Sequence, residues 1–216
     1  MLLAPETIQG PGGTDSARGF FLLPLSDITT WSELPARQTG TMKTLFVLRH
    51  AKAEDGGDGL PDFDRALNDR GRNEARAVGI LIRKQNVRLD LVLSSPAVRA
   101  RETTELILSS GELSLNVRYD QRIYEGGSPR LLEVISQLED EMSTVLLVGH
   151  NPGLEELLTL LTNRIEHLAT GTLAKIDLKA AGQGPDANRA RGTREWSKVL
   201  EQKGTLDWAV KPKDLT

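Results

Sequence analysis

The stretch TLFVLRHAKAE, residues 44–54, places an arginine and a histidine directly after an apolar run. Residues 44–48 are typical of a strand buried on both faces, because such strands carry continuous rather than alternating apolar side chains. In open α/β sheets, functional sites form where the chain leaves the carboxyl ends of the strands. Arg49 and His50 are therefore candidate functional residues, although charged residues at a strand end also commonly do no more than meet water.

Strand-like and helix-like segments alternate after this first strand. Residues 68–85 place Ala75, Val78 and Ile82 at helical spacing. The other expected helices are 97–110, 129–140 and 153–161, and the expected strands are 89–95, 115–119, 143–150, an edge strand at 171–178 and a last strand at 195–200. Residues 180–194 read as a long loop. The pattern predicts an α/β fold with a mainly parallel sheet between helices.

The first 41 residues differ in composition from the rest of the chain. They are rich in glycine, proline and threonine, and only FFLLPL (20–25) is apolar. Acidic residues precede this short apolar stretch, whereas a signal peptide carries basic residues before a longer one. We expect residues 1–41 to be a disordered extension, or sequence upstream of the true start codon, and residues 42–216 to form the domain.

Composition and charge narrow the class of protein. The chain has 216 residues, of which 38% are hydrophobic and 26% charged, as in ordinary globular domains. Its net charge of −3 indicates no general affinity for nucleic acid or anionic membrane. It contains no cysteine, which excludes disulfides, thiolate nucleophiles and cysteine-ligated zinc. No apolar stretch approaches a membrane span, so the cytoplasm is the expected location. We also expect a monomer.

Two later joins between strand and helix resemble the first in carrying polar residues. Ser95-Pro96 predicts an N-cap followed by a proline at the first helical position, with Arg99 one turn into the helix. Asn151-Pro152 repeats this arrangement directly after His150. Because helix N-termini direct free N–H groups outward, a pocket at these joins is suited to an anion.

Two histidines and two arginines suit phosphoryl transfer. Arginine matches phosphate oxygens with two parallel hydrogen bonds, and a neutral imidazole is a competent nucleophile toward phosphorus. A second, protonated histidine can hold the oxygens of the transferring group. We expect no cofactor and no metal, since the motif histidines lack the close His/Asp partners typical of metal sites. A metallohydrolase and a non-catalytic phosphate-binding module remain the alternatives.

Three motifs, LRHAKAE, SSPAVRARET and VGHNPGLEELL, occur in this order and resemble the histidine phosphatase superfamily, which has the phosphoglycerate mutase-like fold. Within it the chain is most similar to the SixA-type phosphohistidine phosphatase branch, over about residues 42–216. The resemblance implies a three-layer α/β/α fold. It also implies that His50 is the nucleophile and that the phosphate pocket is formed by Arg49, Arg99 and His150. Arg65 would face the same site, and Ser95 would add a contact.

The chain also departs from the mutase-like pattern. Ala51-Lys52-Ala53 follows Arg49-His50, where mutase-like members carry a glycine and other polar residues, and this argues against sugar-phosphate substrates. Glu125, within DQRIYEGG (120–127), resembles the proton-donating glutamate of those members. The short segment between Glu125 and His150 leaves no room for a helical lid. An open site suits phosphohistidine on a protein, and a small phosphomonoester is the alternative substrate.

Overall fold

The computed structural model describes residues 42–56, 59–124, 126–179 and 195–215. The expected N-terminal extension, the expected loop at 180–194 and Glu125 lie outside these residues, so what the sequence indicates for them stays a prediction.

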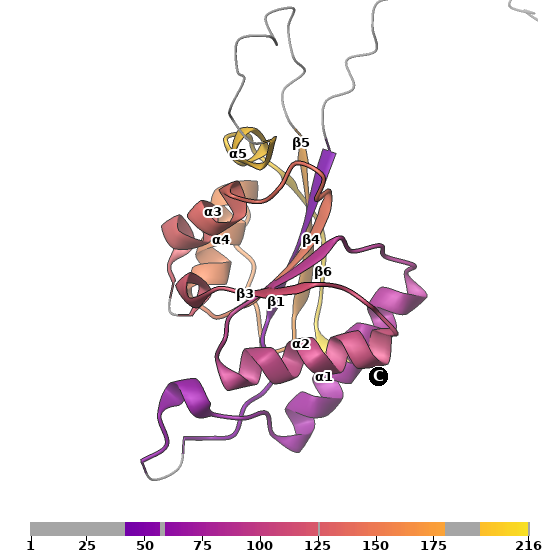
Figure 1. The fold of residues 1–216 in the computed structure, drawn as a ribbon, viewed down its shortest axis with the longest axis vertical. Coiled ribbons are helices and arrows are strands. Elements are labelled where there is room, and N and C mark those ends of the chain that lie inside the picture. Colours follow the sequence, from indigo (N-terminus) through magenta and orange to yellow (C-terminus); the bar gives the residue numbers. More distant parts are fainter. Residues whose placement is uncertain (1–41, 57–58, 125, 180–194, 216) are drawn as a thin grey trace, which may run out of the picture. The chain divides into compact units, whose positions relative to one another are not determined.

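A six-stranded sheet forms the centre of the described residues (Figure 1). Its strand order is β3-β2-β4-β1-β5-β6. The bounds are β1 Met42–Arg49, β2 Leu91–Ser94, β3 Val117–Tyr119, β4 Thr144–Gly149, β5 Leu173–Lys179 and β6 Thr205–Val210. The first four strands pair in parallel, whereas β5 is antiparallel to both β1 and β6. The predicted mainly parallel sheet is confirmed, but β5 is not the edge strand, because β6 covers it.

Helices cover both faces of this sheet (Figure 1). One face carries α1 (Asp69–Lys84) and α2 (Val98–Gly111). The other carries α3 (Ser128–Ser136), α4 (Gly153–Thr162) and α5 (Glu195–Leu200). Short 3-10 turns span Asp62–Asp64, Gln121–Ile123 and Pro212–Asp214. The three-layer α/β/α fold expected from the resemblance is therefore confirmed, and no described helix is long and apolar enough to cross a membrane.

The segment 195–200 is a helix, so the expectation of a last strand there is wrong. Trp196 and Val199 are both fully buried, and their spacing of three residues is helical. The indole N–H of Trp196 donates to the carbonyl of Met142 at 2.8 Å, which anchors this short helix to the loop before β4. The last strand lies further on, at β6.

Side chains of β1 alternate between two apolar clusters. Leu45 and Val47 pack with α3, α4 and α5, whereas Phe46 and Leu48 pack with α1 and α2. All four are at most 2% exposed. This double burial explains the continuous apolar run, because neither face of the strand meets water.

The pairing register brings three loop starts to one edge of the sheet. Arg49 lies opposite Gly149, and Ser94 lies opposite Val148. The chain therefore leaves β1, β4 and β2 at the same level. The backbone N–H of His50 donates to the carbonyl of Gly149 at 3.1 Å, which holds the first of these exits against the end of β4.

Candidate active site

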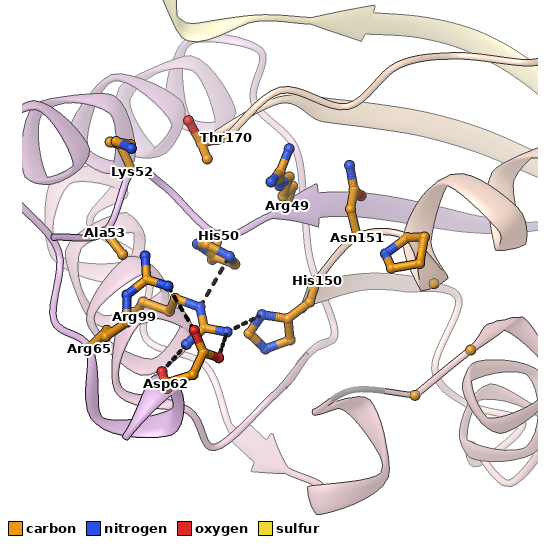
Figure 2. Close-up of a pocket in the computed structure, with 14 residues that line it drawn as sticks. Arg49, His50, Lys52, Ala53, Asp62, Arg65, Arg99, His150, Asn151 and Thr170 are labelled. Atoms are coloured by element: carbon orange, nitrogen blue, oxygen red, sulfur yellow. Dashed lines mark hydrogen bonds and ion pairs between the residues drawn. The ribbon is translucent and has the colours of Figure 1, made fainter. Parts of the chain in front are cut away.

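A pocket of about 570 Å³ lies at this carboxyl edge of the sheet (Figure 2). The polar side chains that line it are Arg49, His50, Lys52, Asp62, Arg65, Arg99, His150, Asn151 and Thr170. Four of them are cationic and only one is a carboxylate, among the described lining residues. The pocket is therefore suited to an anion.

His50 presents one unprotonated ring nitrogen to the pocket. Its Nδ1–H donates to the carbonyl of Ala51 at 2.8 Å, which fixes the tautomer, and its Nε2 accepts from Nε of Arg99 at 3.2 Å. Burial first, and then the charges of Arg99 and Arg49, lower the pKa of His50 to about 4, against the opposing effect of the Ala51 hydrogen bond. At pH 7 the ring is neutral, and its Nε2 lone pair can act as a nucleophile once Nε of Arg99 donates to the bound anion instead.

His150 lies beside His50, with ring centroids 4.9 Å apart. Its Nδ1 accepts from Nη2 of Arg99 at 3.3 Å, and its Nε2–H donates to the hydroxyl of Ser95 at 2.8 Å. Burial, then His50 and then Arg99, lower the pKa of His150 to about 3. In the pocket as it stands both rings are therefore neutral at pH 7, and the protonated second histidine stays a prediction for the phosphate-bound state. A bound dianion would raise this pKa again.

Arg99 connects the two histidines. It is the second residue of α2, and its side chain is buried. In Figure 2 its guanidinium lies between the two rings on one side and Asp62 on the other. The guanidinium can therefore donate to an anion held between the rings.

Arg49 and Arg65 approach the pocket from the end of β1 and from the loop before α1. Nη1 of Arg49 donates to the carbonyl of Leu168 at 2.8 Å, and its buried Nε has no hydrogen-bond partner within the part of the chain that the structure describes. Arg65 donates to the carbonyl of Glu54 at 2.9 Å and to Oδ1 of Asp62 at 2.7 Å. Both guanidinium groups can supply further charge to an anion.

Neither Ser95 nor Asn151 is the side-chain N-cap that the sequence predicts. The N-cap positions of α2 and α4 are Ala97 and Pro152, and neither makes a side-chain cap hydrogen bond. Ser95 instead contacts His150, and the amide of Asn151 donates to Glu155 at 2.6 Å and to the carbonyl of Leu168 at 2.9 Å. Ser95 also accepts the backbone N–H of Ala97 at 3.3 Å, and Glu155 belongs to α4, so each side chain contacts both the pocket and the start of its helix.

The structure brings together six of the seven residues predicted from the sequence. These are Arg49, His50, Arg65, Ser95, Arg99 and His150. Glu125 lies outside the described residues, next to Gly126, which lines the pocket. Sequence reasoning missed Asp62, although it stands three residues before the predicted site residue Arg65. No group of three or more His, Asp or Glu side chains able to hold a metal occurs in the described ranges.

Comparison with known proteins identifies the family. The family model of the histidine phosphatase superfamily (branch 1) matches residues 45–129. An uncharacterized protein of Mycobacterium tuberculosis is 35% identical over 116 residues, which are 54% of this chain and 70% of the relative. A solved structure described as the "putative phosphohistidine phosphatase SixA from Agrobacterium tumefaciens" is 33% identical, with a TM-score of 0.59, over 63% of this chain and 92% of that one. The chain belongs to the histidine phosphatase superfamily.

Within this superfamily the chain is SixA-like, as the motifs indicate. The structure of the protein histidine phosphatase SixA complexed with tungstate covers 80% of this chain and 99% of that one, with a TM-score of 0.65. Its identity is 22%, so it supports the fold alone. The predicted family and fold are thereby confirmed for this histidine phosphatase superfamily member.

Proposed function

We propose that the protein is a phosphatase that works through a phosphorylated His50, with phosphohistidine on a protein as its substrate. The observation that carries the proposal is the orientation of His50. Its Nδ1–H is held by the carbonyl of Ala51, so the lone pair of Nε2 lies beside Arg99 and His150. A neutral nucleophile next to cationic donors is what phosphoryl transfer needs.

In the first step Nε2 of His50 attacks phosphorus, and the bond from phosphorus to the substrate nitrogen breaks. The departing imidazole takes a proton from water. Arg49 and Arg99 donate to the phosphoryl oxygens, and His150 takes up a proton as the dianion raises its pKa. In the second step water attacks phosphorus, the P–Nε2 bond breaks and inorganic phosphate forms. Because Nδ1 of His50 keeps its proton throughout, the ring leaves phosphorus as neutral imidazole.

Two observations favour a substrate carried on a protein. Lys52, Arg65 and Asp62 at the pocket rim are all partly exposed. The described residues that follow Glu125 are used for α3 and β4, which pack in the layers of the fold, so none of them forms a helix over the pocket. The SixA relative at 33% identity is also described as a "putative phosphohistidine phosphatase". The cytoplasmic location, the monomeric state and independence of metals stay predictions.

The test is a panel of phosphohistidine protein, a phosphoramidate and common phosphoesters, assayed with and without a chelator. We expect turnover of phosphohistidine, insensitivity to the chelator and a phosphoenzyme that is acid-labile and alkali-stable. His50→Ala should lose both turnover and the phosphoenzyme, and His167→Ala, at an exposed histidine outside the pocket, is the matched control. Preference for a small phosphoester would establish the alternative substrate. Phosphate binding without any turnover would establish a binding module instead.

A further inference from the structure

Asp62 is the only carboxylate among the described residues that line the pocket, which is unexpected in a site built for an anion. It begins the 3-10 turn Asp62–Asp64, and its side chain is 49% exposed. Oδ1 accepts from Nη1 of Arg65 at 2.7 Å. Oδ2 accepts from Nη2 of Arg99 at 2.8 Å and from the hydroxyl of Tyr124 at 3.2 Å. The carboxylate thus joins two arginines and a tyrosine.

The guanidinium of Arg99 uses two different edges. Its Nη1 and Nη2 end faces Asp62, where Nη1 donates to the main-chain carbonyl at 2.5 Å and Nη2 donates to the carboxylate. Its Nε and Nη2 side faces Nε2 of His50 and Nδ1 of His150. Figure 2 shows this arrangement, with Asp62 on the side of Arg99 away from the histidines. Asp62 does not occupy the side that faces both rings, so the N–H groups there can pass from the two histidines to two phosphoryl oxygens.

We infer that Asp62 is a positioning residue, which holds the end of Arg99 so that its Nε and Nη2 side is directed at the phosphoryl group between His50 and His150. The inference rests on the proposed function and adds to it a residue that acts through Arg99. By binding Arg65 with its other oxygen, the same carboxylate keeps the two guanidinium groups at a fixed separation.

The surroundings of Asp62 support this role over the two other roles open to a carboxylate here. A residue that blocks the pocket would occupy the side of Arg99 that faces the histidines, whereas Asp62 occupies the opposite end. A general acid must carry a proton. Partial burial favours the protonated form of Asp62, but Arg99, Arg65 and Tyr124 outweigh this effect and lower the pKa, so the group is ionised at pH 7.

An aromatic contact braces the same arrangement. The ring of Tyr124 meets that of His150 edge-on at 5.5 Å and that of Phe63 at 4.9 Å. Because Phe63 is the next residue after Asp62, the 3-10 turn and His150 are linked through Tyr124. The carboxylate of Asp62 is therefore held by the two arginines and by Tyr124. A residue that sets the orientation of another side chain must itself be fixed in this way.

The test compares Asp62→Asn and Asp62→Glu with the control Asp64→Asn, which removes an exposed charge from the same turn. For Asp62→Asn we expect kcat to fall about 10²-fold, since a small misplacement of a catalytic group has effects of this size. Inorganic phosphate, measured by calorimetry, should bind as tightly as before, because the variant also removes a repelling charge. Asp62→Glu should recover part of kcat, and Asp64→Asn should behave like the wild type.

A second measurement is independent of activity. The Nε–H of Arg99, which donates to His50, should give a slowly exchanging NMR signal that Asp62→Asn loses and Asp64→Asn keeps. If Asp62→Asn kept both its kcat and the Arg99 signal, the inference would be overturned. Tighter phosphate binding with undiminished kcat would also overturn it, because Asp62 would then be a residue that blocks the pocket. If kcat, phosphate affinity and melting temperature all fell together in Asp62→Asn, the inference would be overturned in favour of a purely structural role. A wild-type protein that neither binds phosphate nor turns over would overturn the proposed function itself.

Discussion

His50 and His150 lie side by side because they follow neighbouring parallel strands in matched register. Arg49 is opposite Gly149, so the next residue of each strand reaches the pocket at the same level, and the ring centroids are 4.9 Å apart. The unprotonated nitrogens of these two neutral imidazoles share one donor, the guanidinium of Arg99. The parallel pairing of β1 and β4 therefore determines the geometry of the proposed phosphoryl site.

Arg99→Lys should be a poor enzyme even though the positive charge is kept. An ammonium cannot reproduce the two parallel N–H donors that face His50 and His150, and losing one such donor to a transition state costs about 3 kcal/mol, or roughly 10²-fold in kcat. Arg101→Lys, at an exposed position of the same helix, is the matched control. A fully active Arg99→Lys variant would contradict two-point binding of the phosphoryl group by this residue.

Both pocket histidines should titrate well below an ordinary histidine. The pKa values of about 4 for His50 and about 3 for His150 lie below the usual 6.5 because burial and the nearby positive charges disfavour the imidazolium form. NMR of the ring carbons should therefore show both rings neutral down to about pH 5. Arg99→Gln should raise both pKa values, since it removes a neighbouring cation. A pocket histidine titrating between pH 6 and 7 would refute this prediction.

The same shifts give stability a defined pH dependence. Between pH 4 and 6.5 the unfolded chain binds protons at these two positions and the folded chain does not, so stability rises with pH in this window. The contribution is fully present above pH 6.5 and is lost as the pH falls toward 4. Chemical denaturation at several pH values should show this slope, and it should be smaller in His150→Asn than in the wild type. Equal slopes in the two proteins would argue against the pKa shift of His150.

The elements best predicted from the sequence are those whose apolar pattern follows directly from burial. The run in β1 is apolar throughout because Leu45 and Phe46 pack on opposite sides of the sheet. Shorter elements near the end of the chain were less predictable. The six residues at 195–200 are too few to distinguish a helical from a strand pattern of apolar side chains. Strand β6 carries an exposed Asp207, and its ion pair with Lys175 of β5 is apparent only in the tertiary structure.

The pocket residues were predictable because they are polar side chains that lie just beyond strand ends. Other residues were missed or assigned another role because their local sequence pattern indicated a different function. Ser95 and Asn151 each precede a proline and a helix, which is the local pattern of an N-cap, but their side chains contact His150 and Glu155. Asp62 carries the same sign of charge as the expected ligand. Only its contacts to Arg99 and Arg65 reveal why a carboxylate belongs at this site.

We propose that residues 42–216 form the catalytic domain and that the first 41 residues are dispensable for it. Their sequence shows neither helical nor strand periodicity, and Met42 is the first residue of β1. A protein beginning at Met42 should therefore keep the melting temperature and kcat of the full chain, measured by calorimetry and by the phosphatase assay. A large loss of stability would mean instead that the apolar stretch FFLLPL (20–25) packs on the domain.

Glu125→Gln should separate substrates by their leaving groups if Glu125 is the proton donor that the sequence predicts. An alkoxide leaving a phosphoester is strongly basic and needs a proton as it departs, so the variant should lose about 10²–10⁴-fold in rate on alkyl phosphoesters. The histidine that leaves phosphohistidine can be protonated by water beforehand. Phosphorylation of His50 by this substrate should therefore be affected far less.

Single-turnover rates of Glu125→Gln on both substrate types measure this difference, and Glu141→Gln, at an exposed position before β4, is the control for loss of a carboxylate. Release of phosphate from His50 should slow in Glu125→Gln with either substrate, because the carboxylate would also activate the incoming water. If Glu125 acts first as an acid and then as a base, the variant should phosphorylate His50 much more slowly only with alkyl phosphoesters. It should release phosphate from His50 more slowly with both substrates. Equal and small effects on both substrates would instead leave Glu125 as a loop residue without a chemical role.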